Sequence, residues 1–190
     1  MSVNTTPSCP TGCSTILPHA DFNYCSPENS FGEITHIFFA ALDAACFTNW
    51  GSVVEWTNRL SNTDDDIDAV RFFHVKADKP VGERDTMEIS LGRKVKSPAT
   101  YTINIEVDDV SDLNYEFMRA SQCDTMFRMW YATPDYLFGG VCGVEVNLNL
   151  DYQIERGTKS IHKIIGTATW EDPFTPERID NPLSGTTLTD

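Results

Sequence analysis

The sequence predicts a mainly β (α+β) fold, an antiparallel β-sandwich or rolled sheet of about seven strands with one or two short flanking helices. Long segments alternate apolar and polar residues, helical patterns occur at only two places, and both ends are rich in residues that favour extended chain. Strict alternation is typical of antiparallel strands that bury one face. We therefore expect a β-sandwich domain over residues 31–171, between an extended N-terminal arm (1–30) and an extended C-terminal arm (172–190).

The clearest strand pattern covers residues 144–152, VEVNLNLDY, where Val, Leu and Tyr alternate with Glu, Asn and Asp without a break. Residues 101–107 and 87–91 alternate in the same way. Residues 34–42 are more continuously apolar, which predicts a central strand. Further strand candidates cover residues 69–76, 126–133 and 161–170, and Gly92, Gly139, Gly140 and Gly157 supply turns.

The two predicted helices cover residues 52–60 and 111–122. Each begins at a serine whose hydroxyl can cap the first turn. Acidic residues follow early in the second helix, where they favour a helix N-terminus. The residues expected to share one face are Val53, Trp56 and Leu60 in the first helix and Leu113, Phe117 and Ala120 in the second.

Both arms have compositions that do not build a core. Residues 1–30 are rich in Ser, Thr, Pro, Asn and Cys, and residues 172–190 contain three prolines. Chain ends fray unless something ties them down. We therefore expect the arms to contact neighbouring subunits; the alternative is that they lie across their own domain.

The charge balance excludes some classes of partner. The chain has 28 acidic and 14 basic residues, a net charge of −14, which argues against a general DNA or RNA binder and against docking on anionic membranes. Residues 59–96 hold eight bases and eight acids, so the acidic excess lies on either side of them. This distribution suits a protein that self-associates and presents an acidic surface elsewhere. The alternative is an acidic surface kept for solubility. The most apolar stretch, residues 37–46, is too short to span a bilayer.

The six cysteines form two sets. Cys9, Cys13 and Cys25, with His19 between them, are four possible zinc ligands, but their spacing does not match a knuckle or ribbon. We expect free thiols there, with a bound metal or a disulfide as alternatives, and we expect no cofactor. Cys46, Cys123 and Cys142 lie in or beside apolar segments and are expected in the core.

The chain contains no nucleophile elbow, zinc-protease helix, phosphate loop or dinucleotide fingerprint. His36, His74 and His162 each fall in a strand candidate, where a polar-face or hydrogen-bonded histidine is expected. We therefore expect a protein that is not an enzyme.

An acidic run at residues 64–68 offers aspartates at the first three ligand positions of a calcium-binding EF-hand loop. Ala69 then stands where that loop needs glycine, and Val75 stands where it needs a bidentate glutamate. A solvated loop is expected, and a calcium-dependent binding module remains a remote alternative.

Three segments resemble tail tube (major tail) proteins of tailed bacteriophages: FGEITHIFFA at 31–40, EISLGRKVKSPATYTINIEVDDVSDLNYEFMR at 88–119 and WYATPDYLFGGVCGVEVNLNLDY at 130–152. The order of the predicted strands and helices is also similar to that of this family. The resemblance implies a β-sandwich with a flanking helix and extended arms. The family has no catalytic set, so the resemblance carries over no functional residue.

The resemblance implies a structural virion protein, assembled in the host cytoplasm, that forms stacked, usually hexameric rings with itself and contacts other virion proteins. Sheet edges would pair between subunits, and the arms would join successive rings. DNA would be a passing cargo that an acidic lumen repels. The residues expected to face the lumen are Glu106, Asp108, Glu145, Asn147, Asn149 and Asp151. The alternative is another virion component, either a neck or stopper ring or a capsid-associated protein.

Overall fold

The computed structural model describes residues 32–186 except 63–65, 124–125, 155 and 158–159. The predicted N-terminal arm lies outside the described residues, and so do the possible zinc ligands Cys9, Cys13, His19 and Cys25.

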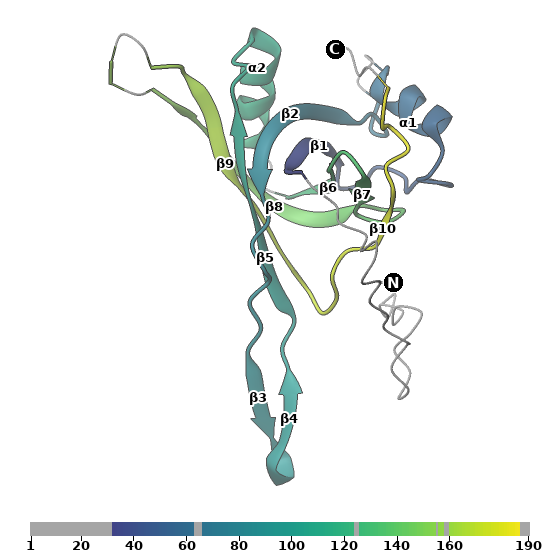
Figure 1. The fold of residues 1–190 in the computed structure, drawn as a ribbon, viewed down its shortest axis with the longest axis vertical. Helices are drawn as coiled ribbons and strands as arrows, with labels where there is room; N and C mark the ends of the chain where they lie inside the picture. The colour runs from purple at the N-terminus through teal and green to yellow at the C-terminus, as the bar shows by residue number, and fades with distance from the viewer. Residues whose placement is uncertain (1–31, 63–65, 124–125, 155, 158–159, 187–190) are drawn as a thin grey trace, which may run out of the picture. The chain divides into compact units, whose positions relative to one another are not determined.

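Six antiparallel strands form a closed barrel in the described chain (Figure 1). Their order around the barrel is β1 (Ile34–Ala41), β2 (Arg71–Asp78), β5 (Ala99–Val107), β9 (Lys163–Asp172), β8 (Val144–Gln153) and β6 (Met126–Ala132). The barrel closes because β6 also pairs with β1, from His36 opposite Ala132 to Ala41 opposite Phe127. The predicted mainly β, antiparallel class is confirmed. The rolled sheet closes on itself rather than splitting into the two layers of a sandwich, because β1 finds a partner on each of its edges.

The alternating sequences become strands with one face inside the barrel. On β8 every second residue from Val144 to Leu150 is buried, while the intervening residues are exposed. On β5 the inward side chains of Tyr101, Ile103, Ile105 and Val107 are likewise buried. Together with inward residues of the other four strands and Met118 they form the main hydrophobic core.

The continuous apolar pattern of β1 has a separate cause, because both faces of this strand are covered. Ile37 and Phe39 belong to the barrel core, while Phe38 and Ala40 face a second apolar cluster outside the barrel. This second cluster includes Phe47, Trp50, Trp56, Val70, Trp130, Leu137 and Leu183. A strand buried on both faces reads as an unbroken apolar run, as the sequence predicted for a central strand.

Helix α1 (Val53–Leu60) begins as predicted. The Ser52 hydroxyl accepts a hydrogen bond from the Glu55 amide at 3.4 Å. Trp56 is fully buried, and its indole N–H donates to the Trp50 carbonyl at 2.7 Å.

Helix α2 (Asp112–Ser121) lies within the predicted range, but the predicted apolar stripe is wrong. Phe117 packs against the core with Met118, whereas Leu113 is 71% exposed and Ala120 is exposed. The buried face is shifted by one residue because the helix packs beside β8, where the contact geometry decides which side faces inward.

Four shorter strands complete the described chain. β7 (Tyr136–Phe138) pairs with the end of β6, and β10 (Arg178–Asp180) pairs with β7. Leu183 then packs into the second cluster. Residues 178–183, within the expected C-terminal arm, therefore lie across their own domain. β3 (Thr86–Ile89) and β4 (Arg93–Lys96) pair only with each other and form a separate hairpin between β2 and β5.

The prediction that Cys46, Cys123 and Cys142 are core thiols is wrong. Cys46 and Cys142 form a disulfide, with Cα atoms 4.3 Å apart, and Cys123 is an exposed free thiol at the end of α2. The cysteines themselves lie in connecting segments, Cys46 in the loop after β1, Cys123 just after α2 and Cys142 in the turn before β8, so the inward-facing strand residues near them do not bring them into the core.

Candidate functional site

The β3–β4 hairpin projects from the barrel and is exposed on both faces (Figure 1). Register places Met87 opposite Val95 and Ile89 opposite Arg93, so three apolar side chains share one face. Glu88 and Lys94 face each other on the opposite side. The hairpin is therefore amphipathic, yet within the described chain it has no core of its own to cover.

At the tip of the hairpin, Leu91 has φ = 67° and its side chain is 100% exposed. A left-handed backbone is unfavourable for a residue with a Cβ atom, and a fully exposed leucine gains no stability from burial. The fold of the single chain therefore gives no reason for leucine at this position.

The base of the hairpin is fixed to the barrel. Ser97 and Asp85 exchange two hydrogen bonds, from Ser97 N to Asp85 O at 2.8 Å and from Asp85 N to Ser97 Oγ at 3.0 Å. Glu83 and Thr100 exchange two backbone hydrogen bonds of 3.0 Å just below. Arg84 also donates to the Tyr101 hydroxyl at 3.1 Å. These contacts set the direction in which the hairpin leaves the barrel.

The hairpin has the opposite charge to the rest of the chain. Residues 86–96 carry three basic side chains, Arg93, Lys94 and Lys96, against the single acid Glu88, whereas the whole chain carries −14. An apolar, basic projection on an acidic molecule is complementary in charge to the surface of another copy.

The predicted lumen-facing residues of β8 lie together on the outer wall of the barrel. Glu145, Asn147, Asn149 and Asp151 are all exposed there. Asn147 and Asn149 pair across the sheet with Thr169 and Thr167 of β9, which extends the polar surface over two strands.

Glu106 lies on β5, which β9 separates from β8, and Asp108 follows β5; the structure places lysines beside both acids. Lys163 binds Glu106 at 2.6 Å and approaches Asp108 at 3.9 Å, and Lys76 lies 3.5 Å from Asp108. These two acids therefore contribute little net negative charge to the outer wall. Glu145 and Asp151 lie on that wall with no ion pair within 4.0 Å in the described chain.

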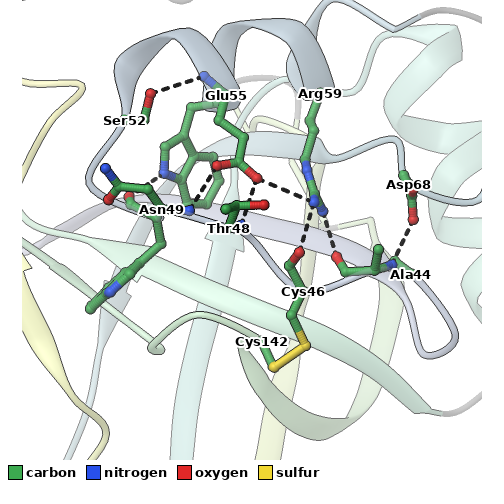
Figure 2. A network of polar contacts seen from close by, with 12 residues as sticks. Ala44, Cys46, Thr48, Asn49, Ser52, Glu55, Arg59, Asp68 and Cys142 are labelled. Carbon is green, nitrogen blue, oxygen red and sulfur yellow. Dashed lines mark hydrogen bonds and ion pairs between the residues drawn. A yellow bond between two sulfur atoms is a disulfide. The ribbon is translucent and has the colours of Figure 1, made fainter.

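A second set of polar contacts holds the loop that follows β1 (Figure 2). The Glu55 carboxylate accepts hydrogen bonds from the amides of Thr48 and Asn49 at 2.8 and 2.9 Å and pairs with Arg59 at 3.5 Å. Arg59 in turn donates to the carbonyls of residues 45 and 46. The Cys46–Cys142 disulfide joins this loop to the turn before β8, and Phe47 N donates to Val141 O at 2.8 Å beside it.

His36 and His74 lie on strands as expected from the sequence, whereas His162 does not. The rings of His36 and His74 meet across β1 and β2 with centroids 4.4 Å apart, and His36 Nδ1 lies 2.9 Å from the Thr35 hydroxyl. Burial, and secondarily the nearby His74, lowers the pKa of His36 below its ordinary value. His162 precedes β9, and its Nδ1 lies 2.9 Å from the Tyr152 hydroxyl. His36 also lines a pocket of about 280 Å³ together with Pro134, Asn181 and Leu183.

The described part of the acidic run has a structural explanation. Asp66 accepts hydrogen bonds from Asn62 Nδ2 at 2.8 Å and from the Asp68 amide at 3.1 Å. Asp68 accepts from the Ala45 amide at 2.6 Å, which attaches this loop to the one after β1. Across the described residues, no group of three or more His, Cys, Asp or Glu side chains is arranged to hold a metal ion.

Sequence reasoning missed the hairpin as a surface. It expected residues 87–91 to be a strand within the sandwich and gave no role to the basic RKVK segment at 93–96. An alternating segment followed by Gly92 and a short charged segment is compatible with a hairpin, but its exposure depends on where the barrel ends.

Comparison of the chain with protein-family models, curated proteins and solved structures gave no match. Neither helix of the described chain is long and apolar enough to cross a membrane.

Proposed function

We propose that this protein is a self-assembling structural subunit, the tail tube protein of a tailed bacteriophage virion. It forms stacked rings around a lumen through which DNA passes. The support comes from the exposed apolar and basic surface of the β3–β4 hairpin and from the resemblance of three sequence segments to that family.

The observation that carries the proposal is the exposed apolar face of the hairpin. Met87, Ile89 and Val95, with Leu91 at the tip, present apolar surface that the rest of the described chain leaves exposed. Contiguous exposed apolar surface on a projecting element is typical of an interaction site. The basic charge of the hairpin selects an acidic partner, and a second copy of this chain supplies one.

Such a contact joins two different surfaces, the hairpin of one copy and the acidic body of the next. A contact of this type closes into a ring or continues as an open stack. In a tube the hairpin contact closes the ring, and a separate contact between rings stacks them.

In this arrangement the exposed wall of β8 and β9 faces the lumen. Its asparagines and threonines carry no net charge, and Glu145 and Asp151 add negative charge. DNA binding is driven by protein cations that neutralise phosphates and release the counterions condensed on the DNA. Lys163, on β9, is the exception on this wall and is paired with Glu106 at 2.6 Å, so the wall offers DNA few cations to bind and DNA slides past it.

The test compares wild-type protein with a variant in which Ile89 and Leu91 are both changed to Asp. Sedimentation velocity and negative-stain electron microscopy at high concentration should show rings or tubes for the wild type and monomers for the variant. The unfolding midpoint should barely change, because surface substitutions away from packed contacts usually alter stability by less than about 0.5 kcal/mol.

The matched control is Val54→Asp on α1, which replaces a residue that is 69% exposed, at a site far from the hairpin in sequence. This control should assemble like the wild type. Wild-type protein that stays monomeric even beside other tail proteins, or a hairpin variant that assembles normally, contradicts the proposal.

A further inference from the structure

The Cys46–Cys142 disulfide lies next to a guanidinium group that has no carboxylate partner among the residues that the structure describes. Arg128, on β6, donates through Nη1 to the Ala44 carbonyl, and the same nitrogen lies 3.5 Å from Cys46 Sγ. The Arg128 Nε is buried without a hydrogen-bond partner. Within the described residues no carboxylate lies within 4.0 Å of this guanidinium.

Of the other charged groups around the loop, Arg59 and Asp68 are already engaged. Arg59 pairs with Glu55 at 3.5 Å and caps backbone carbonyls (Figure 2). Asp68 accepts the Ala45 amide at 2.6 Å, and Glu145 is opposite Arg128 in register but is exposed to water. The negative charges of Asp68 and Glu145 disfavour a thiolate at Cys46, whereas the positive charge of Arg128 favours one at close range. Arg128 Nη1 lies 3.5 Å from Cys46 Sγ, so Arg128 is the charged group in direct contact with the sulfur.

We propose that Cys46 is a redox-controlled modification site, at which reduction of the disulfide releases a thiolate held by Arg128. Cations beside a cysteine favour its thiolate, which is the reactive form. The proposal does not depend on self-assembly.

The reductant is a low-molecular-weight dithiol. Its thiolate attacks Cys142 Sγ, the Cys46–Cys142 bond breaks, and Cys46 leaves as a thiolate beside Arg128. The second thiol of the reductant then attacks the mixed disulfide and releases Cys142, which takes up a proton. The protein gains two electrons, and the reductant is oxidised to a cyclic disulfide. Disulfide exchange is faster when the departing sulfur is a stabilised thiolate.

Reduction should leave the barrel folded, because other contacts hold the same loop. The Phe47 amide still donates to the Val141 carbonyl at 2.8 Å, and the Glu55 carboxylate still binds the amides of Thr48 and Asn49. Reducing the disulfide should therefore change the reactivity of Cys46 more than it changes the position of the loop.

The test begins with mass spectrometry of the unreduced full chain, which should show Cys46 linked to Cys142. After reduction, the rate of iodoacetamide alkylation at each cysteine is measured against pH by peptide mapping. Cys123, which is exposed and free, is the internal reference. The midpoint for Cys46, the pH at which its alkylation reaches half its maximal rate, should lie below about 8.5, the ordinary pKa of a cysteine thiol. It should also lie below the corresponding pH measured for Cys123.

Arg128→Gln should slow alkylation of Cys46 at pH 7 by about tenfold, which corresponds to a shift of one unit in the midpoint. Arg128→Lys should restore most of the rate because it keeps the positive charge. Arg59→Gln is the matched control: it removes a neighbouring guanidinium that is already paired, and it should change the rate much less.

Three results would overturn the proposal: an absent disulfide in the unreduced chain, a Cys46 midpoint equal to that of Cys123, or an Arg128→Gln variant with the wild-type profile. If Arg128→Gln fails to fold, the wild-type profile and the Arg128→Lys variant decide the question.

Discussion

His36 shows how burial changes the chemistry of one residue. Its ring lies on β1 against His74 and close to Phe38 and Phe72. Burial, followed by the nearby His74, lowers the pKa of His36. In the pH range just below the ordinary histidine value of 6.5, the unfolded chain therefore binds more protons at this residue than the folded chain does. Stability rises with pH wherever that is so.

We therefore predict that His36→Asn weakens the loss of stability on acidification. The contribution of His36 is fully present above pH 6.5 and is lost as the pH falls below that value. Urea unfolding midpoints measured between pH 5 and 7.5 should fall less steeply for this variant than for the wild type. Identical slopes for His36→Asn and the wild type would refute the assignment.

The residues that the sequence placed correctly are those whose environment is set by their near neighbours. Val144 and Glu145 face opposite ways because successive residues of a strand do so, whatever lies around them. The bond between Cys46 and Cys142 joins positions 96 residues apart, and only the closure of the barrel brings them together. The same limit applies to Arg128, whose neighbour Cys46 comes from a distant loop.

At the scale of elements, the strongest strands and both helices could be predicted, because alternation and helical periodicity are local. The predicted serine cap is confirmed for α1, at Ser52, and is wrong for α2, where the Ser111 side chain makes no capping hydrogen bond. The closure of β6 onto β1 could not, since an alternating strand carries no information about its partner. The hairpin was predicted as a strand but not as a projection. Its alternation is that of a half-buried strand, and the surface that would bury it is not part of the described chain.

The pairing of β8 with β9 depends on Gly166. A Cβ atom at this position would lie 2.0 Å from the Asn149 carbonyl oxygen and 2.9 Å from Leu150 Cα. Both are backbone atoms of the adjacent strand, so an alanine forces the strands apart. We predict that Gly166→Ala lowers the free energy of unfolding by about 3 kcal/mol, the upper range for overpacking.

Urea denaturation checks this prediction through the unfolding midpoint. Thr167→Ala, the next residue on the same strand, is the control and should cost less than about 1 kcal/mol because Thr167 is only half-buried. A Gly166→Ala variant as stable as the control would mean that the two strands are further apart than described.

At the scale of the whole molecule, the charge is arranged by surface. The hairpin is basic, and Glu106 and Asp108 are matched by lysines. In the described part of the chain, the acids of the β8 wall have no ion pair and lie beside neutral amides. The sequence alone indicated a balanced central block and acidic flanks. It could not assign these charges to surfaces, because the lysines that neutralise Glu106 and Asp108 come from β9 and β2.

If the β8 wall lines a lumen, its charge controls how DNA passes. We predict that changing Glu145 and Asp151 together to Lys makes assembled tubes retain short duplex DNA, whereas wild-type tubes release it. Retention should weaken with salt, and each added phosphate contact should contribute about 0.9 to the slope of log affinity against log salt. Labelled duplex that co-sediments with the tubes at several salt concentrations gives this slope.

The control for this experiment changes Glu33 and Asp43 to Lys, which alters the net charge equally at exposed positions outside β8. If the β8 wall faces the lumen, a ring of subunits repeats each new lysine around the DNA, so the β8 variant gains several phosphate contacts at once. Lysines on an outer surface meet only DNA that approaches from outside, and they should give weaker retention with a smaller slope. Equal retention by the two variants would show that net charge, and not the position of the β8 wall, governs contact with DNA.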